Sequence, residues 1–331
     1  MYKSLARQCE HFHLYIFAFC DVSLQLLRTL NLPHVTIVSL DELEDEALLE
    51  IKPTRTRGEY CWTCASSILW YCLVKLNLSH CTYVDADIYF YSDPQILIDE
   101  MGAASVLITE HRFSPNYMGS VRFGRYCVQF MTFKNTPQGL QVLAWWRNAC
   151  LTWCYNRLEG GKFGDQKYLD DWTTRFEGVH VLGHLGGGVA PWNLQQYHFK
   201  KTKSQFYLLD SATGSRHDIV FFHFHNVKIK SGRVDAEHLY KTYTMTYHAY
   251  AMFYWGYLKE VRALTRTLHL TCPQIIPVRL TIAVFPLLKS MTKEFRHWLL
   301  IVRLSKRCKV IRVMGFYLWH HDDSDTSAQL S

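Results

Sequence analysis

The sequence predicts an α/β protein in which helices flank a mixed sheet and a helical extension follows at the C-terminus. Through the first 160 residues, short aromatic and β-branched runs alternate with longer apolar or amphipathic segments, as strands alternate with helices. The chain has 331 residues, 49% of them hydrophobic, so it can bury a large core. The longest apolar stretch, residues 275–288, is interrupted by two prolines and an arginine. The sequence therefore predicts no membrane-spanning helix.

The first 40 residues predict two strands with a helix between them. Residues 13–19 are aromatic and β-branched, which favours a buried strand. A helix then begins at Asp21, which we expect to be its N-cap. Residues 35–38 predict the second strand.

The next segments predict a buried helix that leads into a strand. Residues 59–76 are apolar, with charged side chains only near the ends, so we expect a helix packed on the sheet. The apolar run of residues 82–90 follows directly and predicts a strand. Residues 92–94 then form a turn and a possible helix start.

Two further strands and one long helix complete this part of the pattern. Residues 106–109 and 126–133 predict the strands. Residues 138–157 predict the helix, whose apolar face includes Leu140, Leu143, Ala144 and Cys150. In sheets of this kind, ligands gather beyond the carboxyl ends of the strands.

The eleven cysteines are scattered and odd in number, which argues against a disulfide framework. Cys61 and Cys64 have the Cys-x-x-Cys spacing found in redox motifs and in zinc sites, but no second cysteine pair is near enough to complete a zinc site. Cys150 and Cys154 lie one helical turn apart and are expected to pack inward. The N-terminus lacks the pattern of a signal peptide, so we expect a cytoplasmic protein.

The basic excess lies in the last quarter of the chain. Residues 251–331 hold 12 basic and 5 acidic side chains, which accounts for the whole net charge of +7. Residues 290–313 mix these charges with aromatic and aliphatic residues, which predicts a helix on an anionic membrane surface or one packed on the core with a solvated basic face. No nucleic-acid motif accompanies the charge, so nucleic acid is not an expected partner.

These features predict three regions. A domain spans residues 1–245, a basic helical extension spans residues 246–321, and a disordered tail spans residues 322–331.

Two carboxylates, Asp85 and Asp87, lie one residue apart in the apolar run of residues 82–90. Side chains at i and i+2 of an extended chain share a face, so both carboxylates should point at one spot. Two converging anions favour a hard cation such as Mg²⁺ or Mn²⁺, which leaves room for substrate phosphates. Alternatively, the pair lies in a turn and hydrogen-bonds the backbone.

Four segments, taken in order, resemble motifs of GT-A fold glycosyltransferases. Residues 83–88 (YVDADI) are similar to the Asp-x-Asp strand of retaining enzymes of the glycogenin and lipopolysaccharide glucosyl- and galactosyltransferase type, and residues 163–169 (FGDQKYL) to their Asp-Gln element. Residues 220–226 (VFFHFHN) resemble their strand with a metal-binding histidine, and residues 186–193 resemble a segment ending in asparagine near the acceptor. The match extends over residues 1–240 and is best to bacterial enzymes of surface-polysaccharide clusters.

The resemblance implies a Rossmann-like GT-A domain that moves a hexose from a nucleotide diphosphate sugar to a saccharide or lipid-linked acceptor. Asp85, Asp87 and His223 would hold Mn²⁺ or Mg²⁺, with His225 as the alternative ligand on the same strand face. Such a set leaves coordination positions for the diphosphate. A histidine in an aromatic run can equally be a hydrogen-bonded core residue.

Further roles follow from the same resemblance. Asp165 and Gln166 would contact the transferred sugar, although Asp165 could instead be the N-cap of the next helix. By the same resemblance Arg57 would contact a phosphate. From backbone freedom alone, Gly187 in the run of glycines could approach a diphosphate or a sugar, unless that run is a mobile turn. Residues 110–112 could reach the acceptor or the nucleotide.

The chain departs from the GT-A pattern at its start. It begins at a segment that matches the helix after the first strand, so we expect the strand that leads to the base-binding loop to be missing. Two rival functions remain open: a sugar-phosphate nucleotidyltransferase, which typically starts with a glycine-rich basic loop that this sequence lacks, and a degenerate membrane-associated scaffold.

Overall fold

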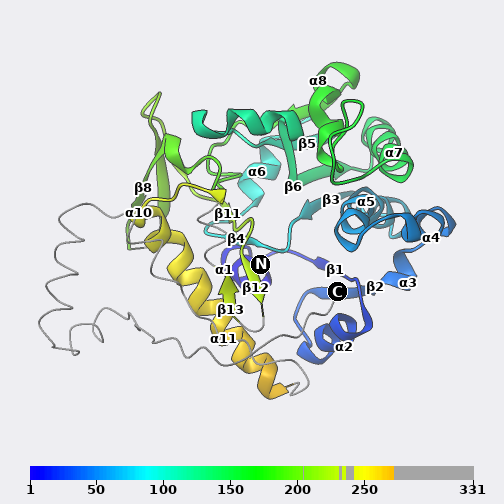
Figure 1. The fold of residues 1–331 in the computed structure, drawn as a ribbon, viewed down its shortest axis with the longest axis horizontal. Coiled ribbons are helices and arrows are strands. Elements are labelled where there is room, and N and C mark those ends of the chain that lie inside the picture. The colour runs from blue at the N-terminus through cyan, green and yellow to red at the C-terminus, as the bar shows by residue number, and fades with distance from the viewer. Residues whose placement is uncertain (204, 231–232, 236–241, 272–331) are drawn as a thin grey trace, which may run out of the picture. The chain divides into compact units, whose positions relative to one another are not determined.

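The computed structural model describes residues 1–203, 205–230, 233–235 and 242–271. They lie in the first of two units into which the chain divides, Met1–Ile282 and Ala283–Ser331. The centre of the first unit is a four-stranded mixed sheet (Figure 1). Its strands, in spatial order, are β3 (His80–Val84), β6 (Tyr126–Lys134), β5 (Val106–Glu110) and β7 (Val179–Val181). Strand β6 runs antiparallel to both of its neighbours, whereas β5 and β7 are parallel.

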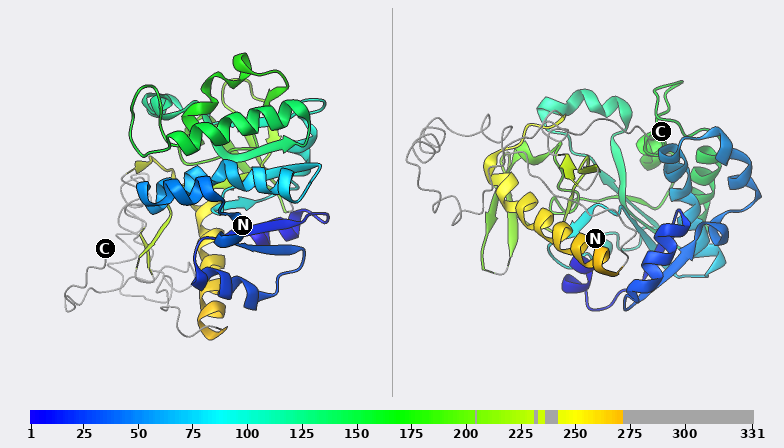
Figure 2. Two further views of the ribbon diagram at one scale, coloured as in Figure 1. Left: turned by 90° about the vertical axis from the view of Figure 1, so that its right-hand side faces the viewer. Right: turned by 60° about the horizontal axis from the view of Figure 1, so that its bottom comes forward.

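Both faces of this sheet are covered, which explains why β5 and β6 read as continuous apolar runs. Val106 and Ile108 of β5 pack into one buried cluster, and Leu107 between them packs into a second cluster on the opposite face. The first cluster lies under α5 (Arg57–Trp70) and α7 (Pro137–Thr152), which run side by side (Figure 2). The sheet thus has the helix-flanked architecture predicted from the sequence.

The second face of the sheet carries a short antiparallel pair, β4 (Ile88–Phe90) and β11 (Phe221–His223). Helices α1 (Tyr2–Gln8) and α6 (Gln95–Asp99) pack on the same side. This pair carries the candidate site described below.

The N-terminal part contains the two strands and the helix expected there. Strands β1 (Leu14–Ala18) and β2 (Val35–Ser39) pair in parallel, joined by α2 (Asp21–Leu30). The expectation that Asp21 caps this helix is wrong, because Cys20 is the extended residue before the first turn and Asp21 is already helical. Asp21 lies instead in the first turn, where its negative charge interacts favourably with the helix dipole.

The remaining elements are short or lie toward the end of the described chain. The helices and helical turns are α3 (Leu40–Leu43), α4 (Glu46–Ile51), η1 (Lys52–Thr54), η2 (Tyr71–Lys75), η3 (Pro115–Phe123), η4 (Gln166–Asp171), α8 (Trp172–Arg175), η5 (Leu194–Gln196), α10 (Tyr247–Ala249), η6 (Tyr250–Tyr254) and α11 (Trp255–Thr271). The strands are β8 (Tyr197–Lys201), β9 (Phe206–Asp210), β10 (Arg216–Asp218), β12 (Lys228–Lys230) and β13 (Arg233–Asp235).

The boundaries of the two long helices differ from those expected, for local reasons. Helix α5 begins at Arg57 because Thr56 and Glu59 form a capping box. Helix α7 ends at Thr152 instead of residue 157, because Trp153 is extended and the Arg55 guanidinium donates a hydrogen bond to the carbonyl oxygen of Leu151 at 3.1 Å.

The basic helix expected over residues 290–313 and the tail of residues 322–331 lie outside the described residues. Within the described part of the chain, no helix is both long and apolar enough to cross a membrane.

Candidate metal centre

Asp85 and Asp87 lie on the tight turn between β3 and β4. The Asp85 N–H donates to the carbonyl oxygen of Gln129 at 3.0 Å, and its own carbonyl oxygen accepts from the Ile88 N–H at 3.2 Å. The carbonyl oxygen of Asp87 accepts from the Phe224 N–H at 2.9 Å. The expectation that both aspartates share one face of a single strand is therefore wrong. A turn held on both sides by neighbouring strands brings the carboxylates together instead.

The two carboxylates meet the imidazole of His223. Its Nε2 lies 3.0 Å from Oδ1 of Asp87 and 3.7 Å from Oδ2 of Asp85. Potential ligand atoms of all three residues lie within 4.8 Å of one another. The side chains of Asp85 and Asp87 are 31% and 41% exposed, whereas that of His223 is 4% exposed. The three residues could hold one metal ion and leave some of the coordination positions of that ion open to solvent.

Two neighbours orient these ligands. Nδ1 of His223 lies 2.6 Å from Oε1 of Gln129 on β6, and the Tyr83 hydroxyl donates to Oδ1 of Asp85 at 3.0 Å. With Nδ1 of His223 donating a hydrogen bond to Oε1 of Gln129, Nε2 is the nitrogen that faces the carboxylates. Such partners fix the tautomer and direction of a metal-binding histidine.

The protonation of the group follows from its charges. Burial lowers the pKa of His223, but Asp87 and Asp85 outweigh this effect and raise that pKa well above its usual value. For Asp87 burial is again the largest effect, but His223 outweighs it and the pKa of Asp87 is lowered. The pKa of Asp85 is raised, mainly by burial. Without metal the site thus holds an imidazolium beside the carboxylates, and a divalent cation would take the place of its proton.

Aromatic residues from η6 and α11 fix the strand that carries His223. Phe222 stacks on Phe253 at 4.5 Å and Phe224 stacks on Tyr257 at 3.7 Å, both measured between ring centroids. Because side chains alternate along an extended chain, anchoring both neighbours directs His223 to the opposite side. Residues 250–257 therefore belong structurally to the candidate site, although the sequence suggested a boundary at residue 245.

Helix α11 also contacts α1, the N-terminal helix. Arg7 pairs with Glu260 on α11 at 2.7 Å and also donates to the Tyr89 hydroxyl at 2.7 Å. Tyr89 lies on β4, next to the turn that carries the aspartates, and its hydroxyl donates to Glu260 at 3.0 Å. Both ends of the described chain thus support the β4 and β11 pair.

We expect Tyr257→Ala to weaken Mn²⁺ binding about tenfold, because His223 loses the stacked support of its neighbour Phe224. Tyr257→Phe keeps the ring and should restore the affinity. The measurement is calorimetric titration of the protein with MnCl₂. Trp255→Ala, which removes a 40% exposed ring from the same helix, is the matched control. Equal affinities in the Tyr257→Ala and wild-type proteins would rule out this supporting role.

Asp165 and Gln166 lie at the start of η4, which packs on β6, the strand that carries Gln129. The Asp165 residue is 7% exposed, and its carbonyl oxygen accepts from the Trp146 indole at 2.9 Å. Burial, and then the charge of Asp85, raises the pKa of Asp165 to about 7. Asp165 does occupy the N-cap position of η4, as the alternative interpretation expected, but its side chain makes no capping hydrogen bond there. Gln166 donates from Nε2 to the carbonyl oxygen of Phe123 at 3.1 Å.

The run of glycines has a packing explanation. A Cβ on Gly187 would lie 2.6 Å from Leu182 and 2.9 Å from Leu97, and the carbonyl oxygen of Gly187 accepts from the Arg112 guanidinium at 2.8 Å. This close packing accounts for the glycine without a ligand, and its contact with a diphosphate stays a prediction. Arg57 is exposed at the first position of α5, and its contact with a phosphate also stays a prediction.

Other candidates from the sequence are engaged within the protein. Glu110 pairs with Arg125 at 3.0 Å. His111 is 5% exposed, and burial lowers its pKa to about 3, which keeps it neutral. Asn193, expected near the acceptor, is 1% exposed and donates to the carbonyl oxygens of His111 and Gly188 at 3.0 and 2.8 Å. His225, the alternative metal ligand, lies with Nδ1 2.8 Å from the Tyr243 hydroxyl.

The cysteines behave as expected. Cys150 and Cys154 are buried, and every cysteine in the described residues is free. Cys64 is also buried, and burial raises its pKa to about 12, so its thiolate is scarce.

Sequence reasoning missed Gln129, Tyr83 and Tyr257. Gln129 did leave a signal, because a glutamine in the middle of the apolar run of residues 126–133 must find a polar partner when buried. Tyr257 left none, because its position depends on how a distant helix packs.

The chain is similar to two proteins of Bacillus subtilis strain 168. It is 32% identical over 228 residues to the uncharacterized protein YfnD, a match that covers 68% of this chain and 71% of YfnD. It is 30% identical over 240 residues to the uncharacterized protein YfnF, covering 70% of this chain and 77% of YfnF. No protein-family model matches. On the extent of these matches, the chain belongs to the family of YfnD and YfnF.

Proposed function

We propose that this protein is a metal-dependent glycosyltransferase that moves a hexose from a nucleotide diphosphate sugar to a saccharide or lipid-linked saccharide acceptor, in surface polysaccharide biosynthesis. The observation that carries the proposal is the convergence of Asp85, Asp87 and His223 within 4.8 Å. The three residues come from two segments far apart in the sequence, in the order of the motifs that suggested this function.

The donor set fits Mn²⁺ or Mg²⁺. Two carboxylates and one imidazole supply oxygen and nitrogen ligands, and the partial exposure of Asp85 and Asp87 leaves coordination positions for a diphosphate. A bound cation would offset the negative charge of the departing nucleoside diphosphate.

The protein's own residues supply the remaining roles. Asp165, buried beside the charge of Asp85, would stabilise positive charge at the anomeric carbon, and Gln166 would contact the sugar. Arg57 and Gly187 would bind phosphates. The basic region of residues 290–313 would place the enzyme at the cytoplasmic face of an anionic membrane.

Release of nucleoside diphosphate tests the proposal. Wild-type protein, incubated with UDP-, GDP- and dTDP-sugars and MnCl₂, should release the nucleoside diphosphate from at least one donor, and EDTA should stop the release. Pyrophosphate release from a nucleoside triphosphate plus a sugar 1-phosphate would instead support a nucleotidyltransferase. Absence of both reactions would favour the scaffold.

A further inference from the structure

We propose that three aromatic side chains next to Asp165 form the binding surface for the acceptor saccharide. They are Trp62 on α5, Phe163 before η4 and Phe123 at the end of η3, and we call them the aromatic strip. This inference rests on the proposed transferase function and identifies where that function would take its second substrate.

The three rings form a continuous row although they come from separate elements. Phe163 is central, with its ring centroid 6.3 Å from that of Trp62 and 4.7 Å from that of Phe123. All three residues are partly exposed. The rings leave part of their apolar surface available to a ligand, and the Arg122 guanidinium lies over the Phe123 ring at 4.7 Å.

The strip is held in place by the element that carries the proposed catalytic residues. Gly164 has a φ of 51°, and a Cβ there would lie 3.4 Å from the Trp62 ring, so the backbone packs directly on Trp62. At the other end, Gln166 donates to the carbonyl oxygen of Phe123 at 3.1 Å. The two residues that flank Asp165 thus contact the two outer members of the strip.

The same element connects the strip to the candidate metal centre. Phe163 precedes η4 by three residues, and η4 packs on β6, the strand whose Gln129 lies 2.6 Å from Nδ1 of His223. A donor held at the metal would direct its sugar toward Asp165. A second substrate lying on the strip would then meet that sugar near Asp165.

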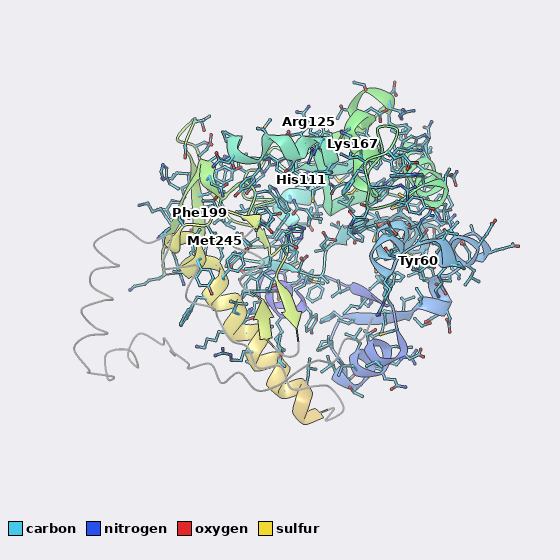
Figure 3. The ribbon with its side chains drawn as sticks, in the orientation of Figure 1. Tyr60, His111, Arg125, Lys167, Phe199 and Met245 are labelled. Carbon is cyan, nitrogen blue, oxygen red and sulfur yellow. The ribbon has the colours of Figure 1, made fainter. Side chains whose placement is uncertain are left out.

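Charged side chains lie near the strip, paired with one another. Lys167 pairs with Asp170 at 2.6 Å, and Asp170 accepts from the backbone N–H of Arg125 at 2.7 Å. Asp170 thus bridges Arg125 and Lys167, both labelled in Figure 3, and Glu110 pairs with Arg125 at 3.0 Å. A pyranose ring has an apolar C–H face that packs on aromatic rings and hydroxyl groups that bond to charged side chains. A row of three rings also exceeds the single sugar of a donor, which favours an oligosaccharide acceptor.

Phe123→Ala and Phe163→Ala test the proposal by glycan binding, which needs neither donor nor turnover. Fluorescently labelled full-length protein is applied to a printed glycan array, and affinities for the bound glycans are then measured in solution. Wild-type protein should bind a subset of glycans, and each substitution should weaken that binding about tenfold. Tyr207→Ala is the matched control, because an arginine covers its ring at 4.1 Å much as Arg122 covers Phe123 at 4.7 Å. Thermal melting confirms that each variant is folded.

The outcomes separate this inference from the proposed function. Glycan binding that is absent, or unchanged in both folded strip variants, would overturn the inference even if nucleoside diphosphate is released. Glycan binding lost in the strip variants without any nucleoside diphosphate release would support the strip and contradict the transferase. If transfer occurs, the strip variants should raise the KM of the acceptor. A rise confined to the KM of the donor would assign the strip to the transferred sugar or its base and overturn the acceptor assignment.

Discussion

Replacing Asp87 with alanine is expected to abolish Mn²⁺-dependent donor binding while the fold survives. The substitution removes one of two carboxylate ligands and leaves His223 without its partner at 3.0 Å, so Mn²⁺ affinity should fall by about a hundredfold or more. The structural role of Asp87 lies in its backbone, because its carbonyl oxygen accepts from the Phe224 N–H and its side chain is 41% exposed. Calorimetric titration with MnCl₂, followed by titration with the nucleotide sugar, measures both losses.

Asp41→Ala is the control for this substitution, because it removes an exposed aspartate from α3 in the N-terminal region. Its metal and donor affinities should match those of the wild-type protein. Circular dichroism checks that the Asp87→Ala protein is folded. If this folded variant binds the donor in Mn²⁺ as tightly as the wild-type protein, the proposed metal centre is wrong.

The three members of this centre could be named from the sequence, but the way they meet could not. Asp85, Asp87 and His223 were recognisable because carboxylates and histidines are rare inside apolar runs and their order resembles a family pattern. Two geometries were predicted: one face of a single strand, or a turn whose side chains bond the backbone. The aspartates do lie in a turn, but their side chains meet His223. Two tertiary hydrogen bonds hold that turn: the Asp85 N–H donates to the Gln129 carbonyl oxygen, and the Phe224 N–H donates to the Asp87 carbonyl oxygen. A local sequence pattern does not contain such bonds.

The helices and strands could likewise be predicted from the sequence, except where tertiary contacts determine their ends. Apolar periodicity located β1, β2, β5, β6 and the two long helices, because burial on a sheet imposes that periodicity. The end of α7 depends on Arg55, almost a hundred residues earlier, which caps a carbonyl oxygen of its last turn. Arg112 left no local sign of its role either, because its partly buried guanidinium donates to the carbonyl oxygens of Leu182 and Gly187, which lie far along the chain. Contacts of this kind become visible only in three dimensions.

Asp165→Asn is expected to lower transfer while it stabilises the metal-free protein at alkaline pH. Removing the buried carboxylate should reduce the transfer rate on the order of a hundredfold, because charge at the anomeric carbon loses a preorganised partner. Mn²⁺ affinity should remain, because Asp165 is not one of the three ligands. Loss of Mn²⁺ binding in this variant would mean that Asp165 supports the metal centre instead of the sugar.

The effect on stability follows from the pKa of Asp165, about 7 in the folded protein against an ordinary value near 3.8. A raised acid pKa means that the folded state holds this proton more tightly than the unfolded state does. The protonated carboxyl therefore contributes its full stability to the fold below pH 4, and this contribution is lost as the pH rises through 7. Asparagine does not titrate, so Asp165→Asn should gain stability relative to the wild-type protein between pH 4 and pH 8, by at most about 4 kcal/mol. Urea unfolding in EDTA at both pH values measures this difference, with Asp41→Asn as the exposed control. If the gain in stability is equal at pH 4 and pH 8, ionisation of Asp165 does not destabilise the folded protein, and the electrostatic role proposed for Asp165 loses its support.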